Sequence, residues 1–242
     1  MKVLGIDSSG MTATAAILTE DELLAEISVN HKKTHSETLL PMVSELMQMT
    51  ELSPADMDVL AVAAGPGSFT GLRIGAATIK GLGLALDKPV AAVPTLMALA
   101  WNAAASSGVV CPMMDARRNE VYAAAYRMPG PGAEHSALPE ELIPGEALPA
   151  AEMAERLNNL GEPVLLLGDG ADATKDILVS RLTVPYRFAP VHMNRQRAAS
   201  VAALGVIFAE KEMLVNVDDF EPVYFRKSQA ERVRDENAAQ RP

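Results

Sequence analysis

Short blocks of Val, Ile, Leu and Ala recur along the chain and alternate with stretches of helical periodicity. Blocks of roughly four to eight apolar residues bounded by turn residues are typical of buried strands. The blocks that predict strands cover residues 3–6, 12–18, 23–29, 59–64, 90–93, 109–114, 120–126 and 164–167. The first three follow one another closely, so we expect them to form an antiparallel meander.

Helices are predicted around the later blocks. Their periodic segments cover about residues 38–49, 70–86, 95–101, 151–160 and 198–210. Before the first helix, Thr34 and Glu37 have the spacing of a capping box, with Ser36 as a competing cap, and Thr95 is expected to cap the third. Pro41 removes one helical hydrogen bond, so we expect the first helix to start late or to bend there. Strands that alternate with helices in this order indicate an α/β fold.

The order of elements begins again near the middle of the chain. Asp7 and Asp115 each end a buried strand and precede a polar turn and a returning strand. This echo predicts a duplicated α/β lobe, and a cleft between the lobes is the default place for a ligand. We expect a first lobe in residues 1–105 and a second lobe in residues 106–190.

The remaining segments are assigned by composition. A helix and a C-terminal segment in residues 191–226 are expected to pack back toward the first lobe. Residues 227–242 are highly charged, which predicts a frayed or disordered tail. Residues 128–149 are acidic and rich in Pro and Gly, which predicts a long surface excursion.

Two of the predicted helices are more apolar than a surface helix needs to be. Between residues 72 and 86 the strongly polar side chains are Arg73, Thr78 and Lys80. In residues 38–49 the apolar positions cover about half of the helical circumference, whereas an ordinary surface helix has an apolar stripe of about 100°. Such helices are either buried between layers of their own lobe or covered by a second molecule. Two of them in one lobe favour the second molecule.

The candidate interface residues lie on these two helices. Gly71, Gly75 and Gly83 each lower the helical propensity by about 1 kcal/mol, so close packing has to compensate. The residues expected at an intermolecular interface are Leu39, Leu40, Val43, Leu46, Met47, Arg73, Gly75, Ala76, Ile79 and Gly83.

Composition limits the classes of function. The chain has 242 residues and a net charge of −10, so we expect little direct binding to nucleic-acid phosphates. Its single cysteine, Cys111, lies in an apolar block, which predicts a core position and excludes an internal disulfide. Asp7 interrupts the first apolar block, and no later run reaches ~18 uncharged apolar residues. We therefore expect neither a signal peptide nor a membrane span, but a soluble cytoplasmic protein.

Few residues form a pattern that could support catalysis or cofactor binding. Asp7, followed by Ser8 and Ser9, could position a magnesium-bound phosphate or could simply cap a turn. Residues 65–68 could expose amides to an anion, but they lack the Gly-Lys-Ser/Thr ending of a phosphate loop, so a tight turn is the alternative. The weak candidates for cofactor binding are Asp7, Ser8, Ser9, Gly168 and Gly170.

The sequence gives even less support for a metal site or a nucleophilic catalytic residue than for a cofactor site. His31 and His35 are four residues apart, but they precede the helix and no third ligand accompanies them, so we expect a solvated loop. No His and Asp are placed to activate Ser8 or Ser9. We therefore expect no catalytic residue, no cofactor and no metal.

Several segments together resemble the bacterial TsaB family of the actin/Hsp70-like superfamily. The resemblance spans nearly the whole chain, and its most specific parts are residues 65–73 and residues 115–122. The other matching stretches are residues 5–9, 35–41 and 222–226. The resemblance implies the duplicated two-lobe fold of that superfamily.

The resemblance also implies a function. Members of the family are non-catalytic paralogues of the transferase TsaD, and they pair with it through helices of the first lobe. The ATPase TsaE joins the pair, which places threonylcarbamoyl on an adenosine beside the anticodon of tRNAs that read codons beginning with A. The family forms homodimers when alone, and tRNA is an indirect partner. TsaD-like enzymes carry a pair of metal-binding histidines, whereas the corresponding residues 101–108 contain none.

Two alternatives stay open at this point. One is an independent nucleotide-binding enzyme of the sugar-kinase or acetate-kinase type, which would need Asp7 and a complete second phosphate loop. Residues 168–170 are a fragment of such a loop. The other is a homodimeric structural protein that uses the same helices. Magnesium-dependent ATP turnover by the purified chain would separate the enzyme from both binding proteins.

Overall fold

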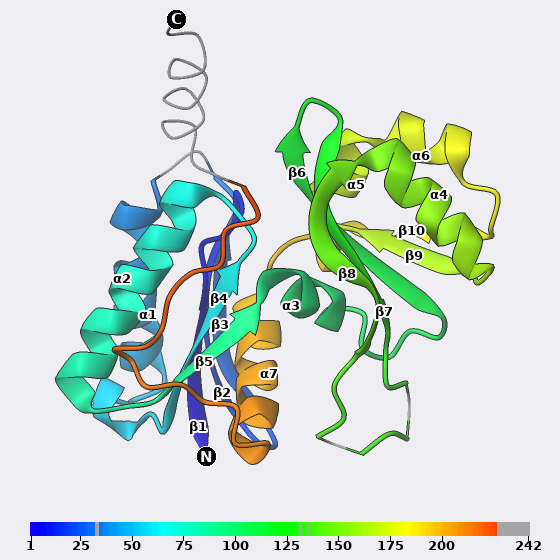
Figure 1. Ribbon diagram of the computed structural model, residues 1–242. Helices are drawn as coiled ribbons and strands as arrows, with labels where there is room; N and C mark the ends of the chain where they lie inside the picture. Colours follow the sequence, from blue (N-terminus) through cyan, green and yellow to red (C-terminus); the bar gives the residue numbers. More distant parts are fainter. Residues whose placement is uncertain (32–33, 131, 135, 227–242) are drawn as a thin grey trace, which may run out of the picture.

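Two mixed β-sheets of five strands each form the centres of two lobes in the computed structural model, which describes residues 1–31, 34–130, 132–134 and 136–226 (Figure 1). The first sheet has the order β3-β2-β1-β4-β5. Its strands are β1 (Lys2–Asp7), β2 (Ala13–Thr19), β3 (Leu23–Val29), β4 (Val59–Gly65) and β5 (Val90–Pro94). The meander predicted from the first three apolar blocks is therefore confirmed, since β1, β2 and β3 pair antiparallel.

The second sheet repeats this topology. Its order is β8-β7-β6-β9-β10, and its strands are β6 (Val109–Arg117), β7 (Glu120–Arg127), β8 (Glu140–Pro149), β9 (Val164–Leu167) and β10 (Tyr186–Phe188). In each sheet the first three strands pair antiparallel, while the fourth strand is parallel to the first and the fifth to the fourth. The predicted duplicated, two-lobed α/β fold is confirmed.

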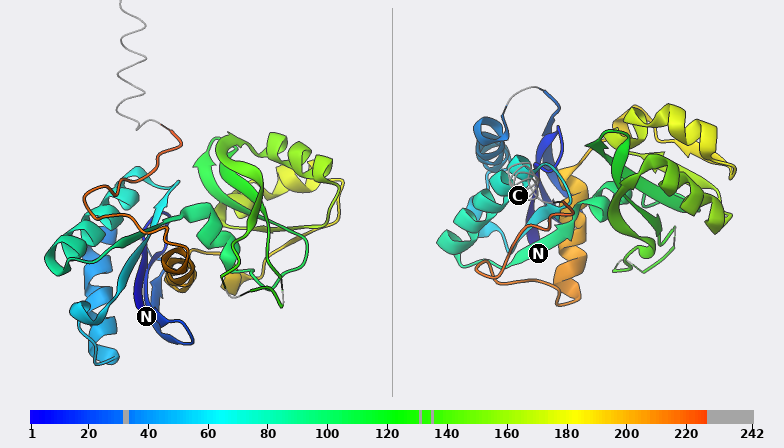
Figure 2. Two further views of the ribbon diagram at one scale, coloured as in Figure 1. Left: turned by 60° about the horizontal axis from the view of Figure 1, so that its bottom comes forward. Right: turned by 45° about the horizontal axis from the view of Figure 1, so that its top comes forward.

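Helices follow the strands in the same order in both halves of the chain. Those of the first lobe are α1 (His35–Met49), η1 (Pro54–Asp56), α2 (Phe69–Leu86) and α3 (Thr95–Trp101). Those that follow are α4 (Ala150–Leu160), α5 (Asp169–Ala173), α6 (Lys175–Arg181), η2 (Val191–Met193) and α7 (Ala198–Glu210). Figure 2 shows α1 and α2 on one face of the first sheet and α7 on the other. Among the described residues, no helix has the length and hydropathy needed to cross a membrane.

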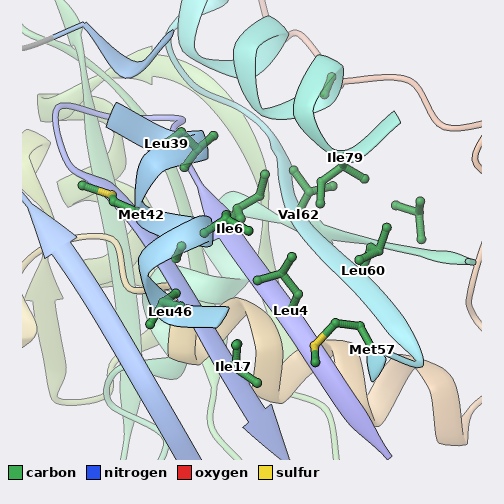
Figure 3. Packing of buried hydrophobic residues seen from close by; sticks show 14 of the residues in the cluster. Leu4, Ile6, Ile17, Leu39, Met42, Leu46, Met57, Leu60, Val62 and Ile79 are labelled. Atoms are coloured by element: carbon green, nitrogen blue, oxygen red, sulfur yellow. The ribbon is translucent and has the colours of Figure 1, made fainter. Parts of the chain in front are cut away.

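The alternation of side chains along β1 divides the first lobe into two apolar layers. Leu4 and Ile6 pack with α1 and α2, as Figure 3 shows, while Val3 packs with α7 on the opposite face. Gly5 lets α7 approach β1 closely, because a Cβ at this position would be 2.6 Å from the carbonyl oxygen of Ala198. The first sheet is thus buried on both faces, which is why its strands are almost purely apolar in sequence.

The last helix of each strand–helix series packs across the boundary between the lobes. Leu96 and Leu99 of α3 pack with Val110 and Leu167 of the second sheet. Conversely, α7 follows the second sheet in the chain but packs against β1, β2 and β4 of the first. The two lobes are therefore held together by helices as well as by the chain that joins them.

The prediction for residues 128–149 is wrong in its second half. Residues 140–149 form β8, which pairs with β7 and completes the meander of the second lobe. Pro144 and Gly145 lie inside it, and the pairing has two register shifts. Pro is tolerated on an edge strand because one side of the strand needs no ladder hydrogen bonds. An irregular, charged edge strand therefore has a loop-like sequence. The short strand β10, at the other edge, was not predicted.

Two predictions about helix starts are also wrong. α1 begins at His35, well before Pro41, so the helix does not start late but runs through the proline, and a bend at Pro41 stays a prediction. Burial of Leu39 and Val43 on both sides of Pro41 offsets the lost hydrogen bond. The capping box is not formed, because the side chain of Thr34 makes no cap hydrogen bond. Thr95 is the first residue of α3, and its hydroxyl accepts a hydrogen bond from the amide of Gly65 (3.0 Å).

Candidate functional site

A cleft of about 480 Å³ lies between the lobes. The first lobe contributes the turn after β1 and the N-terminal ends of α1 and α2, and the second lobe contributes the end of β6 and the start of α5. The last described residues, 224–226, close one side. The lining residues are Ser9, Gly10, Met11, His35, Gly67, Ser68, Phe69, Met114, Asp115, Ala116, Arg117, Tyr122, Asp169, Tyr224, Phe225 and Arg226.

Asp7 is buried beneath this cleft and does not line it. Its Oδ1 atom accepts hydrogen bonds from the amide (2.7 Å) and the hydroxyl (2.6 Å) of Ser9. Burial raises the pKa of Asp7 to about 6, although the hydrogen bonds from Ser9 and the charge of His35 act in the opposite direction. The carboxyl group is thus engaged in its own turn, as the turn-capping alternative requires.

Ser8 and the glycine-rich residues 65–73 are also engaged with each other. The hydroxyl of Ser8 donates to the carbonyl of Gly71 (2.9 Å), and the amide of Ser68 donates to the carbonyl of Ser9 (2.6 Å). A Cβ on Gly71 would lie 2.0 Å from the carbonyl oxygen of Ser8. These contacts fit the tight-turn alternative, in which the glycines let the start of α2 rest on the first turn of the chain.

In the second lobe, Gly168 and Gly170 play a similar packing role. A Cβ on Gly168 would lie 2.0 Å from the carbonyl oxygen of Met113, and one on Gly170 would lie 2.6 Å from the backbone of Met114. The residue between them, Asp169, reaches the cleft instead, where it accepts a hydrogen bond from the amide of Asp115 (3.2 Å). Burial raises the pKa of Asp169 above its usual value.

His35 does not lie in a solvated loop, so that prediction is wrong for this residue. It is the first residue of α1, its Nε2 atom lies 2.8 Å from the carbonyl oxygen of Gly10, and it lines the cleft. Its place at the start of the family-like residues 35–41 was the sequence signal for this role. No group of three His, Cys, Asp or Glu side chains in the described part of the chain could hold a metal. Cys111 is buried in the core, as predicted.

Most of the candidate interface residues face the lobe's own interior. Leu39, Val43, Leu46, Met47, Ala76 and Ile79 belong to the cluster between α1, α2 and the first sheet (Figure 3). Gly75 faces the Ser8 hydroxyl, and Gly83 faces Val217 of the C-terminal segment. The two that reach the surface are Leu40, which is 56% exposed, and Arg73. The apolar excess of these helices therefore includes a large share of ordinary core packing.

A different set of residues forms the outer surface of α2. It begins at Thr70 and Arg73 and continues at helical spacing through Ala77, Gly81, Leu84 and Ala85. We call these six residues the outer face of α2. Apart from Arg73, they were not predicted, because the number of apolar residues in a helix does not say which side faces the sheet. The signal that could have found them is the run of small residues in register with Arg73.

The comparisons with known proteins agree with one another. A family model described as tRNA N6-adenosine threonylcarbamoyltransferase (TsaD) matches residues 22–233. The protein TsaB of Bacillus subtilis, named for tRNA threonylcarbamoyladenosine biosynthesis, is 34% identical over 96% of both chains. TsaB of Escherichia coli is 31% identical over 73% of this chain and 75% of its own. The structure of YeaZ from Pseudomonas aeruginosa superimposes with a TM-score of 0.77 at 26% identity and covers 92% of this chain and 99% of YeaZ.

Proposed function

The chain belongs to the TsaB family, and from this we propose that it acts in the synthesis of threonylcarbamoyladenosine in tRNA as a non-catalytic subunit. Its role is to dock on a TsaD-like transferase through the first lobe and to stabilise the active arrangement of that enzyme. A TsaE-like ATPase is the third component, and the complex works in the cytoplasm. In the absence of the transferase, a second copy of this chain occupies the same face.

The outer face of α2 is the observation that carries this proposal. Leu84 is 61% exposed, and Arg73 is the only charged side chain among the six residues of the face. Gly81 is exposed, and a Cβ there would meet nothing within 4 Å. Its own fold therefore does not require glycine at this position, although glycine costs the helix about 1 kcal/mol. Close approach of another helix would supply the missing reason.

The contacts beneath the cleft support a non-catalytic role. Enzymes that transfer phosphoryl groups need carboxylates and backbone amides that are free to meet the metal and the phosphate. Here the Asp7 carboxylate is 1% exposed and bound to Ser9, and the amide of Ser68 is bound to the carbonyl of Ser9. Steady ATP hydrolysis by the purified chain that is abolished by Asp7→Ala would instead favour a kinase-like enzyme.

We expect tRNA to be bound by the transferase and not by this chain, for reasons of net charge and of coupling between docking and activity. With a net charge of −10, the subunit opposes rather than supplies phosphate binding. A docked partner can still activate the transferase if it binds the active arrangement more tightly, and a coupling of about 2–3 kcal/mol changes activity roughly 30- to 150-fold. Depletion of the protein should therefore remove threonylcarbamoyladenosine from tRNA, as measured by nucleoside mass spectrometry. Tight tRNA binding by this chain alone at physiological salt would contradict the proposal.

The docking face is tested directly by binding of the purified transferase from the same cells. Leu84→Glu should weaken binding at least tenfold, because it places a carboxylate in an apolar contact, and Gly81→Trp should block the close approach of helices. The matched control is Val179→Glu on α6, because Val179 is an exposed apolar residue (47%) on the second lobe. Equal affinity of the Leu84→Glu and Val179→Glu variants would place the interface elsewhere.

A further inference from the structure

The last described residues, 223–226, cross from the first lobe to the second, and we call them the strap. Figure 1 shows the chain after α7 returning beside α2 to the end of the molecule where the cleft lies. On the first lobe, the amide of Val223 donates to the carbonyl of Ala64 (2.7 Å). Gly65, with φ of 124°, allows this contact, since a Cβ there would lie 2.0 Å from the carbonyl oxygen of Val223.

The second half of the strap is anchored on the other lobe. The rings of Phe225 and Tyr122 form a T-shaped pair with 6.1 Å between their centroids, and the Phe225 ring lies against Gly145 of β8. Arg226 donates to the carbonyl of Ala116 (3.0 Å), pairs with Glu120 and lies over the ring of Tyr122. The strap therefore makes specific contacts with both lobes within four residues.

The outward side of the strap continues the outer face of α2. The Phe69 ring lies between the two. Its centroid is 4.8 Å from the centroid of the Tyr224 ring and 4.0 Å from the guanidinium carbon of Arg73. Tyr224 is 37% exposed and Val223 is 52% exposed. Arg73 is exposed and forms no ion pair with any described residue, so no described carboxylate occupies its guanidinium group. A row of side chains thus leads from α2 onto the strap.

We propose that the partner-docking surface extends from the outer face of α2 over Phe69 onto Tyr224 and Val223 of the strap, so that a partner docked on the first lobe also fixes the position of the second. The inference rests on the proposed function and takes the same transferase-like protein as the occupant. The partner is expected to place an apolar or aromatic group against Tyr224 and Val223 and a carboxylate against Arg73. Docking at Tyr224 and Val223 restrains the second lobe as well, because the adjacent Phe225 and Arg226 are bound to that lobe.

The first test measures the affinity of the full-length variants for the transferase. Tyr224→Ala should weaken binding about tenfold, and Tyr224→Phe should retain wild-type affinity because the ring, not the hydroxyl, makes the contact with Phe69. Tyr186→Ala is the matched control, since Tyr186 has the same exposure (37%) and its ring also packs against that of a phenylalanine, Phe188, but it lies on β10. Equal affinities of Tyr224→Ala and Tyr186→Ala would overturn the proposal.

The second test measures the distance between the lobes. Spin labels on cysteines introduced at Ser44 of α1 and Glu155 of α4, both exposed, report one distance, and the native Cys111 is too buried to react. Addition of the transferase should narrow the distance distribution of the otherwise wild-type chain. Phe225→Ala should abolish that narrowing while binding persists. Narrowing that survives in Phe225→Ala would overturn the coupling through the strap.

Comparison with Leu84→Glu separates failure of this inference from failure of the proposed function. If Leu84→Glu weakens binding and Tyr224→Ala does not, the docking face ends at α2 and the extension onto the strap is wrong. If neither variant weakens binding, the proposed first-lobe interface itself is wrong, and the inference falls with it.

Discussion

The two lobes have the same strand order but differ in the helices that cover the outer side of their sheets. In the first lobe, α2 is one unbroken helix of 18 residues whose outer face is small and almost uncharged. The corresponding segment of the second lobe is divided at Thr174 into α5 and α6, with 5 and 7 residues. The helix α4, which packs beside α6, carries Glu152 and Arg156 at the surface, where they form an ion pair.

This difference shows where a duplicated fold is free to diverge. The inner layers of both lobes are fixed by burial, because a packed core tolerates few changes in volume or polarity. The outer side of a helix carries no such constraint, and the second lobe uses much of it for charged groups that favour solution, although Val179 of α6 is also exposed (47%). The first lobe instead exposes Leu84 and Gly81, neither of which improves its own stability. The asymmetry of the two lobes therefore lies in their surfaces, and it is the basis on which we propose that the first lobe binds the partner.

The largest expected effect tests the contrast between the buried inner side of a helix and its free outer side, on α1. Val43 is 2% exposed, whereas Leu40 on the same helix is 56% exposed. Val43→Glu should lower the free energy of unfolding by on the order of 4–5 kcal/mol, because it buries an unpaired charge, while Leu40→Glu should change it by less than about 0.5 kcal/mol. Urea titration measures both. For this reason Val43→Glu cannot probe the interface, and similar midpoints for the two variants would contradict the burial of Val43.

The equivalent acids of the two lobes sharpen the comparison. The pKa of Asp7 is about 6 in the folded protein against 3.8 as the ordinary value, so the folded state binds more protons between these pH values. Stability should therefore fall as the pH rises from about 4 to 6, by roughly 3 kcal/mol at most. Asp7→Asn keeps the acceptor for Ser9 and should be more stable than wild type at pH 8 but not at pH 4.

Asp115→Asn is the matched control for Asp7→Asn. Asp115 lies near the end of the corresponding strand of the second lobe, β6 (Val109–Arg117), and its side chain is 22% exposed at the cleft. Unfolding curves at both pH values measure the two differences from wild type. A gain for Asp7→Asn that is equal at pH 4 and pH 8 would show that ionisation of the buried carboxyl is not its cause.

Two glycines of α2 distinguish its inner from its outer side. Gly71→Ala should destabilise the protein by about 1–3 kcal/mol, since its Cβ would meet the carbonyl oxygen of Ser8. Gly81→Ala should stabilise the isolated chain by about 0.5–1 kcal/mol, because alanine is the better helix former and nothing lies nearby. Thermal or urea unfolding measures the two changes. The interpretation of Gly81 as an interface residue would lose its basis if Gly81→Ala were destabilising.

The smallest effect is expected on the charged side of the second lobe. Arg156 is partly exposed and pairs with Glu146 and Glu152. Arg156→Ala should lower the free energy of unfolding by less than about 1 kcal/mol, and less still in concentrated salt, because solvent screens exposed ion pairs. Its affinity for the transferase should equal that of wild type. A large loss of binding by this variant would mean that the second lobe also belongs to the interface.

Much of the fold could be predicted from local sequence patterns. The strand of residues 59–64 and the helix of residues 198–210 are found close to where the pattern placed them, because burial on both sides leaves a continuous apolar run whose length distinguishes a strand from a helix. The family was evident from short segments such as residues 65–73, in which Gly67 and Gly71 are required by contact with the first turn. β8 was not predicted, because Pro144 and its charged neighbours at the edge of the sheet have no strand-like pattern.

The site depended far more on tertiary structure. The sequence by itself determined that α2 has too few polar residues for a surface helix, but it did not determine which side is covered by the protein's own sheet. Hydrophobic attraction is non-directional, so a period of apolar residues does not name the surface that will bury them. Only the packing of Gly71 on Ser8 and of Ile79 in the core turned Gly81 and Leu84 outward. Likewise, contacts between residues as distant as Phe69 and Tyr224 arise only when the whole chain has folded.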